Sequence, residues 1–202
     1  MLLSQGAPMQ RSARRVEKIK TVLARRQPDL TVVLENIHDP HNVSAIFRSC
    51  DAVGSMRVEL LYTLEKLPRI GKKSSSSANK WVEKRSHRSV DACYGKLHEE
   101  GFTIYATHLG ETSVSLYDLD LTRSVALVFG NEHRGVSDEA AEKADGIFQI
   151  PMVGMIQSLN VSVACAVSLY EVLRQRLVQG DLEKPKLSAR DQALLFHQWI
   201  AH

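Results

Sequence analysis

The chain has 202 residues, 44% of them hydrophobic and 24% charged, with a formal net charge of +3 at pH 7, which indicates one globular domain with terminal extensions. No apolar run approaches the roughly 20 residues that a membrane span needs, and the N-terminal charges stand in the wrong order for a secretory signal. Three widely spaced cysteines, at positions 50, 93 and 165, argue against a disulfide framework and for reduced thiols in the cytoplasm.

The first predicted element is a basic amphipathic helix over residues 11–26, which contains neither Gly nor Pro and spaces its apolar residues helically. The next predicted elements, in chain order, are a buried strand over 31–37, a helix over 42–54 that stops at Gly54, a strand over 57–62, a polar loop over 66–80, a short strand near 81–85 and a helix over 89–100.

Strands and helices continue to alternate in the second half. The predicted elements are strands over 102–109 and 124–130, a helix over 137–145 capped by Ser137, a strand over 146–151, a long helix over 160–178 and a last helix over 188–200. This alternation predicts an α/β fold with a mostly parallel sheet. Ligands then collect beyond the carboxyl ends of the strands, in the loops 36–42, 107–113, 130–136 and 151–159.

Basic residues gather in two segments, 11–26 and 66–88, whereas acidic residues gather around 139–145. Segregated cations are typical of a surface that faces phosphates. A solvated helix face followed by a polar loop would have the same composition. Charge alone does not choose between the two interpretations.

Three segments carry candidate chemistry. FGNEHRG (129–135) lacks the glycine spacing of a nucleotide-phosphate loop, so a turn is the better interpretation. HDPH (38–41) could offer metal ligands, but Pro40 bends it and no further ligand cluster stands nearby. IPMVGMIQSLNVSVACAV (150–167) places four polar residues between apolar runs. A helix cap explains one of them, and a ligand packed over the loop would explain the exposed, Met-rich stretch before the cap.

Together these segments resemble the SPOUT family, in its branch of RNA ribose 2′-O-methyltransferases. The resemblance rests on ENIHDPHNVSAIFRSCDAVG (35–54), LVFGNEHRGVS (127–137) and IPMVGMIQSLNVSVA (150–164), which stand in the order typical of that family. It extends to LARRQPDLTV (23–32) and KWVEKRSHRS (80–89), and it fades beyond about residue 180.

The resemblance implies a deep trefoil knot in the C-terminal part of the sheet domain, and a homodimer whose active site combines residues of both subunits. It also implies that S-adenosyl-L-methionine (SAM) lies bent in the knot, held mainly by backbone groups of Thr107, Gly130, Ile150 and Leu159. The expected domains are a basic helical extension over 1–29, the knotted domain over 30–178 and a helical tail over 179–202.

The reaction that the resemblance implies is methyl transfer to a ribose 2′-oxygen, with guanosine 18 of tRNA as the expected target. The family's catalytic residues correspond to Asn42, Arg48, Glu132, Ser158 and Asn160. Neutralising a guanidinium at pH 7 costs roughly 9 kcal/mol, so Arg48 is expected to stabilise the developing alkoxide and hold phosphate rather than act as a general base. Glu132 is expected to brace its loop, and either Ser158 or Asn160 to cap the following helix.

The basic segments are then expected to bind tRNA phosphates through Arg11, Arg14, Arg15, Lys18, Arg25, Arg26, Lys72, Lys73 and Lys80. Three alternatives remain open: the same chemistry on ribosomal RNA or at another tRNA position, a non-catalytic RNA-binding paralogue, and a dinucleotide-dependent dehydrogenase. The glycine fingerprint and the ribose-binding acid of the last class are missing.

Overall fold

The structure is a computed structural model that describes residues 8–68, 78–110 and 112–201. Its strands are β1 (Gln27–Glu35), β2 (Ser55–Leu61), β3 (Glu83–His87), β4 (Thr103–Thr107), β5 (Val114–Ser115), β6 (Val125–Phe129) and β7 (Gly146–Gln149). Its helices are α1 (Pro8–Leu23), α2 (Pro40–Val53), α3 (Val90–Glu99), α4 (Asp138–Glu142), α5 (Val161–Val178) and α6 (Ala189–Ile200), with short 3-10 helices η1 (Ala78–Lys80) and η2 (Leu116–Asp118).

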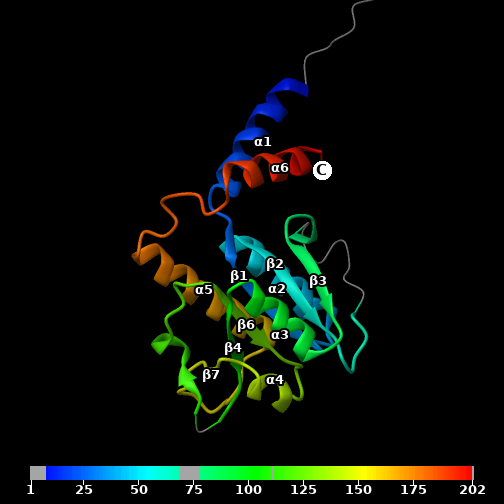
Figure 1. Ribbon diagram of the computed structural model, residues 1–202, viewed down its shortest axis with the longest axis vertical. Helices are drawn as coiled ribbons and strands as arrows, with labels where there is room; N and C mark the ends of the chain where they lie inside the picture. Colours follow the sequence, from blue (N-terminus) through cyan, green and yellow to red (C-terminus); the bar gives the residue numbers. More distant parts are fainter. Residues whose placement is uncertain (1–7, 69–77, 111, 202) are drawn as a thin grey trace, which may run out of the picture.

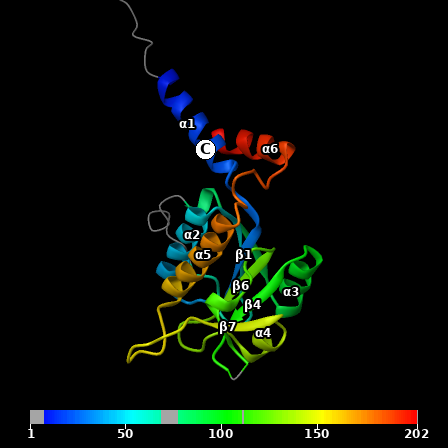
Figure 2. The ribbon, with the colours of Figure 1, turned by 90° about the vertical axis from the view of Figure 1, so that its left-hand side faces the viewer.

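The seven strands form one parallel sheet in the order β3-β2-β1-β6-β4-β7-β5, which confirms the predicted α/β class. Helices α2 and α5 cover one face of the sheet, and α3 and α4 cover the other (Figures 1 and 2). In β1, Leu30, Val32 and Leu34 pack towards α2 and α5, whereas Val33 packs towards α3. Burial of both faces explains why the strands read as almost continuous apolar runs. None of the helices in the described part of the chain is long and apolar enough to span a membrane.

The main predicted elements are present, with shifted ends. The helix expected over 42–54 is α2, and Gly54 ends it in the left-handed conformation with φ of 86°. The strand expected over 31–37 instead begins at Gln27 and ends at Glu35, because Asn36 leaves the extended region with φ of 51°. The two-residue strand β5 and the helix η2 were not predicted, since neither is long enough to show a periodic pattern.

The terminal helices α1 and α6 lie side by side, beyond one end of the sheet (Figures 1 and 2). Ile19 and Leu23 of α1 share a small apolar cluster with Leu187 and Trp199. The ring of Trp199 packs edge-on against that of Trp81, with 5.0 Å between the centroids. The C-terminal tail therefore fixes the direction in which the basic N-terminal helix projects.

The prediction that Arg26 binds RNA is wrong. Its side chain is 1% exposed, donates to the Asp51 carboxylate and the Ser55 carbonyl, and stacks over the Trp199 ring. A guanidinium held in this way is not available to an RNA phosphate. Arg26 joins the terminal helices to the sheet domain instead.

A second buried arginine joins distant parts of the chain. Arg176, near the end of α5, donates to Gln27 and Asp29 at the start of β1, and also to the backbone carbonyls of Leu121 and Arg123. Burial lowers the pKa of Arg176, and the Asp29 carboxylate opposes that shift. The guanidinium thus joins α5 to two segments that lie far from it in the sequence.

Candidate active site

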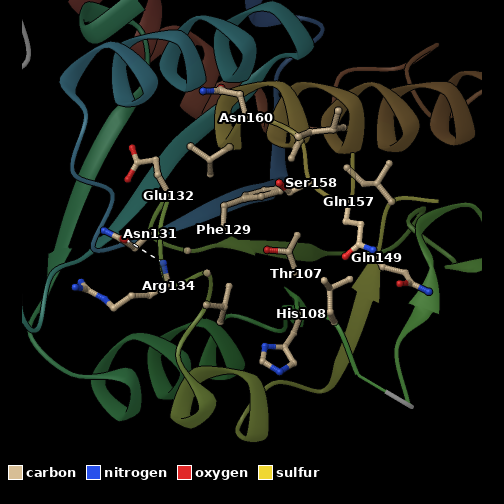
Figure 3. Close-up of a pocket in the computed structure, with 18 of the residues that line it drawn as sticks. Thr107, His108, Phe129, Asn131, Glu132, Arg134, Gln149, Gln157, Ser158 and Asn160 are labelled. Carbon is tan, nitrogen blue, oxygen red and sulfur yellow. Dashed lines mark hydrogen bonds between the residues drawn. The ribbon is translucent and has the colours of Figure 1, made fainter. Parts of the chain in front are cut away.

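A cavity of about 680 Å³ opens at the carboxyl ends of β4, β6 and β7 (Figure 3). The loops 130–136 and 157–160 face each other across it, and the residues that follow β4 and β7 complete its wall. The four residues expected to hold the cofactor, Thr107, Gly130, Ile150 and Leu159, all line this cavity. Their contact with SAM itself remains a prediction.

The loop after β6 folds back on itself at Gly130. A Cβ atom at this position would lie 2.1 Å from the backbone of Gly135 and Val136, so only glycine fits. Asn131 and Gly135 pair across the turn, and the Asn131 side chain accepts hydrogen bonds from the backbone N–H groups of His133 and Arg134. The turn interpretation of this segment is therefore correct locally, and the turn forms one wall of the cavity.

Glu132 ties the loop after β6 to the loop after β1. Its carboxylate accepts from the backbone N–H of His38 at 3.0 Å, from that of Asp39 at 3.1 Å and from the Asn42 side chain at 2.9 Å. Burial raises the pKa of Glu132, but the hydrogen bonds from Asn42, His38 and Asp39 outweigh it, so the net pKa lies below the ordinary value. Glu132 is therefore an anionic brace for the loop, which is the contact expected from the sequence.

A hydrogen-bonded chain continues from Glu132 through two asparagines. Because a carboxylate can only accept, Asn42 must present its amide nitrogen to Glu132 and its oxygen to Asn160. Asn160 donates to that oxygen at 3.0 Å, and its own oxygen accepts from the backbone N–H of Ser162. Asn160 is thus the N-cap of α5, and Ser158 lines the cavity without capping the helix.

Sequence reasoning missed several residues that hold this arrangement. The Asn36 carbonyl accepts from the Asn131 side chain, while the Asn36 side chain accepts from the backbone N–H groups of residues 63–65. The Glu35 carboxylate accepts from both the backbone and the hydroxyl of Ser137, the N-cap of α4. The signal in the sequence was a polar pair at the end of two buried strands: Glu35-Asn36 at the end of β1, and Asn131-Glu132 one residue beyond the end of β6.

Arg48 lies apart from the other expected catalytic residues. It is exposed on α2, outside the cavity lining, and within the described residues it makes no hydrogen bond or ion pair. It follows Asn42 by six residues, which is about one and two thirds turns of the helix. The two side chains therefore leave the helix in different directions, and Asn42 and Arg48 do not contact each other within one chain.

The HDPH segment is engaged in contacts other than metal binding. Asp39 caps α2 by accepting from the backbone N–H of His41, and Nδ1 of His38 lies 3.0 Å from the Glu65 carboxylate. Within the described ranges no three His, Cys, Asp or Glu side chains are grouped as metal ligands.

The other basic residues expected to bind RNA lie on the periphery. Arg14, Arg15, Lys18 and Arg25 are exposed on α1 or just after it, and Lys80 is exposed at the end of η1. Arg11 belongs to α1. Lys72 and Lys73 lie outside the described residues.

A family model described as the SpoU rRNA Methylase family matches residues 29–170. The chain belongs to this family. The resemblance seen in the three sequence segments is thereby confirmed, because all three fall within the matched region.

Several members of the SpoU family are similar over most of the chain. The tRNA (guanosine(18)-2′-O)-methyltransferase of Thermus thermophilus is 45% identical over 191 residues, which cover 95% of this chain and 98% of the relative. The crystal structure of the TrmH/SpoU tRNA modifying enzyme of A. aeolicus matches with a TM-score of 0.87 at 37% identity, over 94% of this chain and 96% of that one. The AdoMet-bound rRNA methyltransferase of Sinorhizobium meliloti matches with a TM-score of 0.66 at 25% identity, over 77% and 59% of the two chains.

Replacing Glu132 with Gln tests the brace. We expect the free energy of unfolding at pH 7 to fall by about 1–3 kcal/mol, because Gln has one accepting oxygen where Glu132 has two, so one of its three donors loses its acceptor. The stabilisation by Glu132 is complete above its unfolded pKa, near 4.5, and is lost as the pH falls through its lower folded value. In urea titrations the difference between the two proteins should therefore shrink below about pH 4.5.

The control for this variant is Glu142→Gln, which removes one exposed negative charge from α4. It should change stability by less than about 0.5 kcal/mol at either pH. A difference between Glu132→Gln and the wild type that stays constant from about pH 7 to about pH 3.5 would contradict the anionic role.

Proposed function

We propose that this chain transfers a methyl group from SAM to the ribose 2′-oxygen of guanosine 18 in tRNA. The observation that carries the proposal is that the second and third family segments line one cavity, and that the hydrogen-bonded chain Glu132–Asn42–Asn160 joins the first segment to both of them. The name and the almost full-length similarity of the Thermus thermophilus relative support tRNA as the substrate.

The cavity suits SAM in size and in chemistry. Its volume falls in the range of cofactor pockets, and its walls combine apolar side chains, such as Phe129, Ile150 and Leu159, with the exposed backbone of the loop after β6. The glycine turn at 130–135 lets a ligand approach that backbone closely. The AdoMet bound to the Sinorhizobium meliloti family member supports the same ligand here.

When bound, SAM supplies an electrophilic methyl group, so the attacking 2′-hydroxyl must lose its proton as the new bond forms. Glu132, Asn42 and Asn160 act indirectly in this scheme, by fixing the loops that hold the two reactants. Ser158, exposed at the cavity wall, is available to the incoming ribose. Arg48 supplies the positive charge that stabilises the developing alkoxide.

The exposed position of Arg48 leads us to propose a homodimer in which each arginine serves the cavity of the partner subunit. Val163, Tyr170 and Leu177 form an exposed stripe at seven-residue spacing on α5, which lies beside α2 on the same face of the sheet (Figure 2). The preceding loop exposes Val153 and Met155 almost completely. Several exposed apolar side chains on one helix and the loop before it are typical of a protein interface.

We also propose the deep trefoil knot that is expected for the SPOUT family. Arg176 supports it, because its guanidinium joins the end of α5 to β1 and to residues 121–123. Contacts of this kind would stabilise a point where the chain crosses itself. An experimental chain trace through residues 119–178 that shows no threading would contradict the knot.

The terminal helices complete the proposal. Held by α6, the exposed cations of α1 would bind the body of the tRNA, and residues 1–29 and 179–202 would act as extensions of the catalytic domain. The three cysteines are free and buried, and burial raises the pKa of Cys93 to about 12. We expect an enzyme with such thiols to work in the cytoplasm.

Incubation with tritiated SAM and either total tRNA or ribosomal RNA tests the function. We expect label only in tRNA, recovered as 2′-O-methylguanosine and mapped to position 18. Label in ribosomal RNA alone would support the ribosomal alternative. No transfer to any RNA, together with retained tRNA binding, would support a non-catalytic paralogue.

A further inference from the structure

The carboxyl edge of the sheet carries one basic side chain after each of four neighbouring strands. Arg134 follows β6, His38 follows β1, Lys66 follows β2 and Arg88 follows β3. The four strands end at the same height in the sheet. Leu34 of β1 pairs with Phe129 of β6, Glu35 of β1 pairs with Leu61 of β2, and Leu61 pairs with His87 of β3. At the usual strand spacing this row, the edge track, spans roughly 15 Å from β6 to β3.

The edge track begins at the cavity and is held in place by an acid. Arg134 lines the cavity, but its guanidinium points away from the centre (Figure 3) and donates to Glu65 at 2.8 Å. The same carboxylate lies 3.0 Å from Nδ1 of His38. Hydrogen bonds from Arg134 and His38 lower the pKa of Glu65, so it is ionised at neutral pH. Glu65 thus positions Arg134 and His38, two neighbouring members of the edge track, and it does not itself line the cavity.

The far end of the edge track borders a hollow of about 170 Å³. Leu60, Tyr62 and Leu67 give it apolar walls, and Lys66 and Arg88 lie at its charged side. Its volume equals that of roughly five or six water molecules in the liquid, which is enough for one planar ring system and well below a cofactor pocket. An apolar hollow between two cations has the composition of a site for a base flanked by phosphates.

The opposite side of the cavity has the opposite charge. Beyond β4 and β7 the surface is hollowed again, but there Asp138, Glu142 and Asp145 line it. A polyanion that reaches the cavity is repelled on this side and attracted on the side of the edge track. The charges therefore favour an RNA strand that leaves the cavity along the edge track and not across β4 and β7.

We propose that the RNA strand next to the target nucleotide runs along the edge track, with its phosphates against Arg134, His38, Lys66 and Arg88 and one unpaired base in the hollow. This inference rests on the proposed function and specifies the path of its substrate. Single-stranded RNA is commonly recognised through splayed bases, and Arg and Lys bind its phosphates.

The double variant Lys66→Gln/Arg88→Gln tests the phosphate contacts, and Arg123→Gln/Lys96→Gln is the matched control. The control removes the same charge from exposed positions outside the edge track. We expect the edge-track variant to raise the Kd for tRNA and the KM about tenfold or more, with unchanged SAM affinity. The slope of log Kd against log salt should become shallower by about 1 to 2, whereas the control should change tRNA affinity less than about twofold.

A third variant, Ser86→Phe, fills the hollow without changing any charge. Ser86 is exposed on the edge strand β3, which tolerates an aromatic residue, and a thermal unfolding curve verifies the fold. We expect its KM for tRNA to rise while the salt slope stays at the wild-type value.

Two results separate the possible failures. If the wild-type enzyme methylates tRNA and both the edge-track variant and Ser86→Phe behave like the control, the path is wrong and the function stands. If the wild-type enzyme transfers no methyl group to tRNA, the proposed function fails, whatever the binding data show.

Discussion

Replacing Arg48 with Ala should lower kcat for tRNA methylation by about 10²- to 10³-fold, the usual cost of removing a charge that stabilises a developing oxyanion. In the proposed role Arg48 acts on the developing alkoxide of the ribose and not on SAM, so the affinity for SAM, measured by calorimetry, should not change. Arg48→Lys should keep part of the rate and the wild-type pH–rate profile if the role is electrostatic. Arg123→Ala, which removes another exposed arginine, is the control and should keep the full rate.

Mixing subunits tests whether Arg48 serves the partner's cavity. Arg48→Ala lacks the arginine, and Ile150→Arg blocks the cavity wall, so each variant alone should be inactive. In a mixed dimer, the intact cavity of the first subunit meets the intact arginine of the second. Activity should then return in part after the two proteins are unfolded together and refolded. If the mixture stays inactive although mixed dimers form, Arg48 acts within its own subunit.

Replacing Gly130 with Ala should abolish SAM binding and destabilise the protein. The added Cβ would lie 2.1 Å from the backbone of Gly135, so the loop that forms one cavity wall cannot keep its shape. Overpacking against backbone costs about 3 kcal/mol or more, which lowers Tm by roughly 6–12 °C in a chain of this size. Calorimetric SAM titration and a thermal unfolding curve measure the two effects.

Gly95→Ala is the matched control for this variant. A Cβ at Gly95 meets no atom within 4 Å, and the residue is exposed in the middle of α3. Alanine there should raise stability by up to about 1 kcal/mol, because it has the better helix propensity. Equal effects of the two substitutions, or normal SAM binding by Gly130→Ala, would show that the tight turn is not required.

The local elements were predictable because their signals lie in short stretches of sequence. Alternating apolar strands and capped helices indicated a parallel sheet, and Gly54 and Ser137 marked helix ends correctly. Two of the three segments that identify the family, 127–137 and 150–164, contain most of the residues that line the cavity, since loops beyond parallel strands meet at one edge. The sequence by itself thus determined the fold class, the family and the loops that form the site.

The partners of individual side chains were decided only by the tertiary structure. Arg26 and Arg14 look alike in a basic stretch, yet Arg26 is buried against Asp51 and Trp199 while Arg14 stays exposed. Glu132 bonds to residues more than 90 positions away, and Arg134 shares Glu65 with His38 across three loops. Burial and hydrogen bonding depend on which segments the fold brings together, and that long-range information is not present in any local pattern.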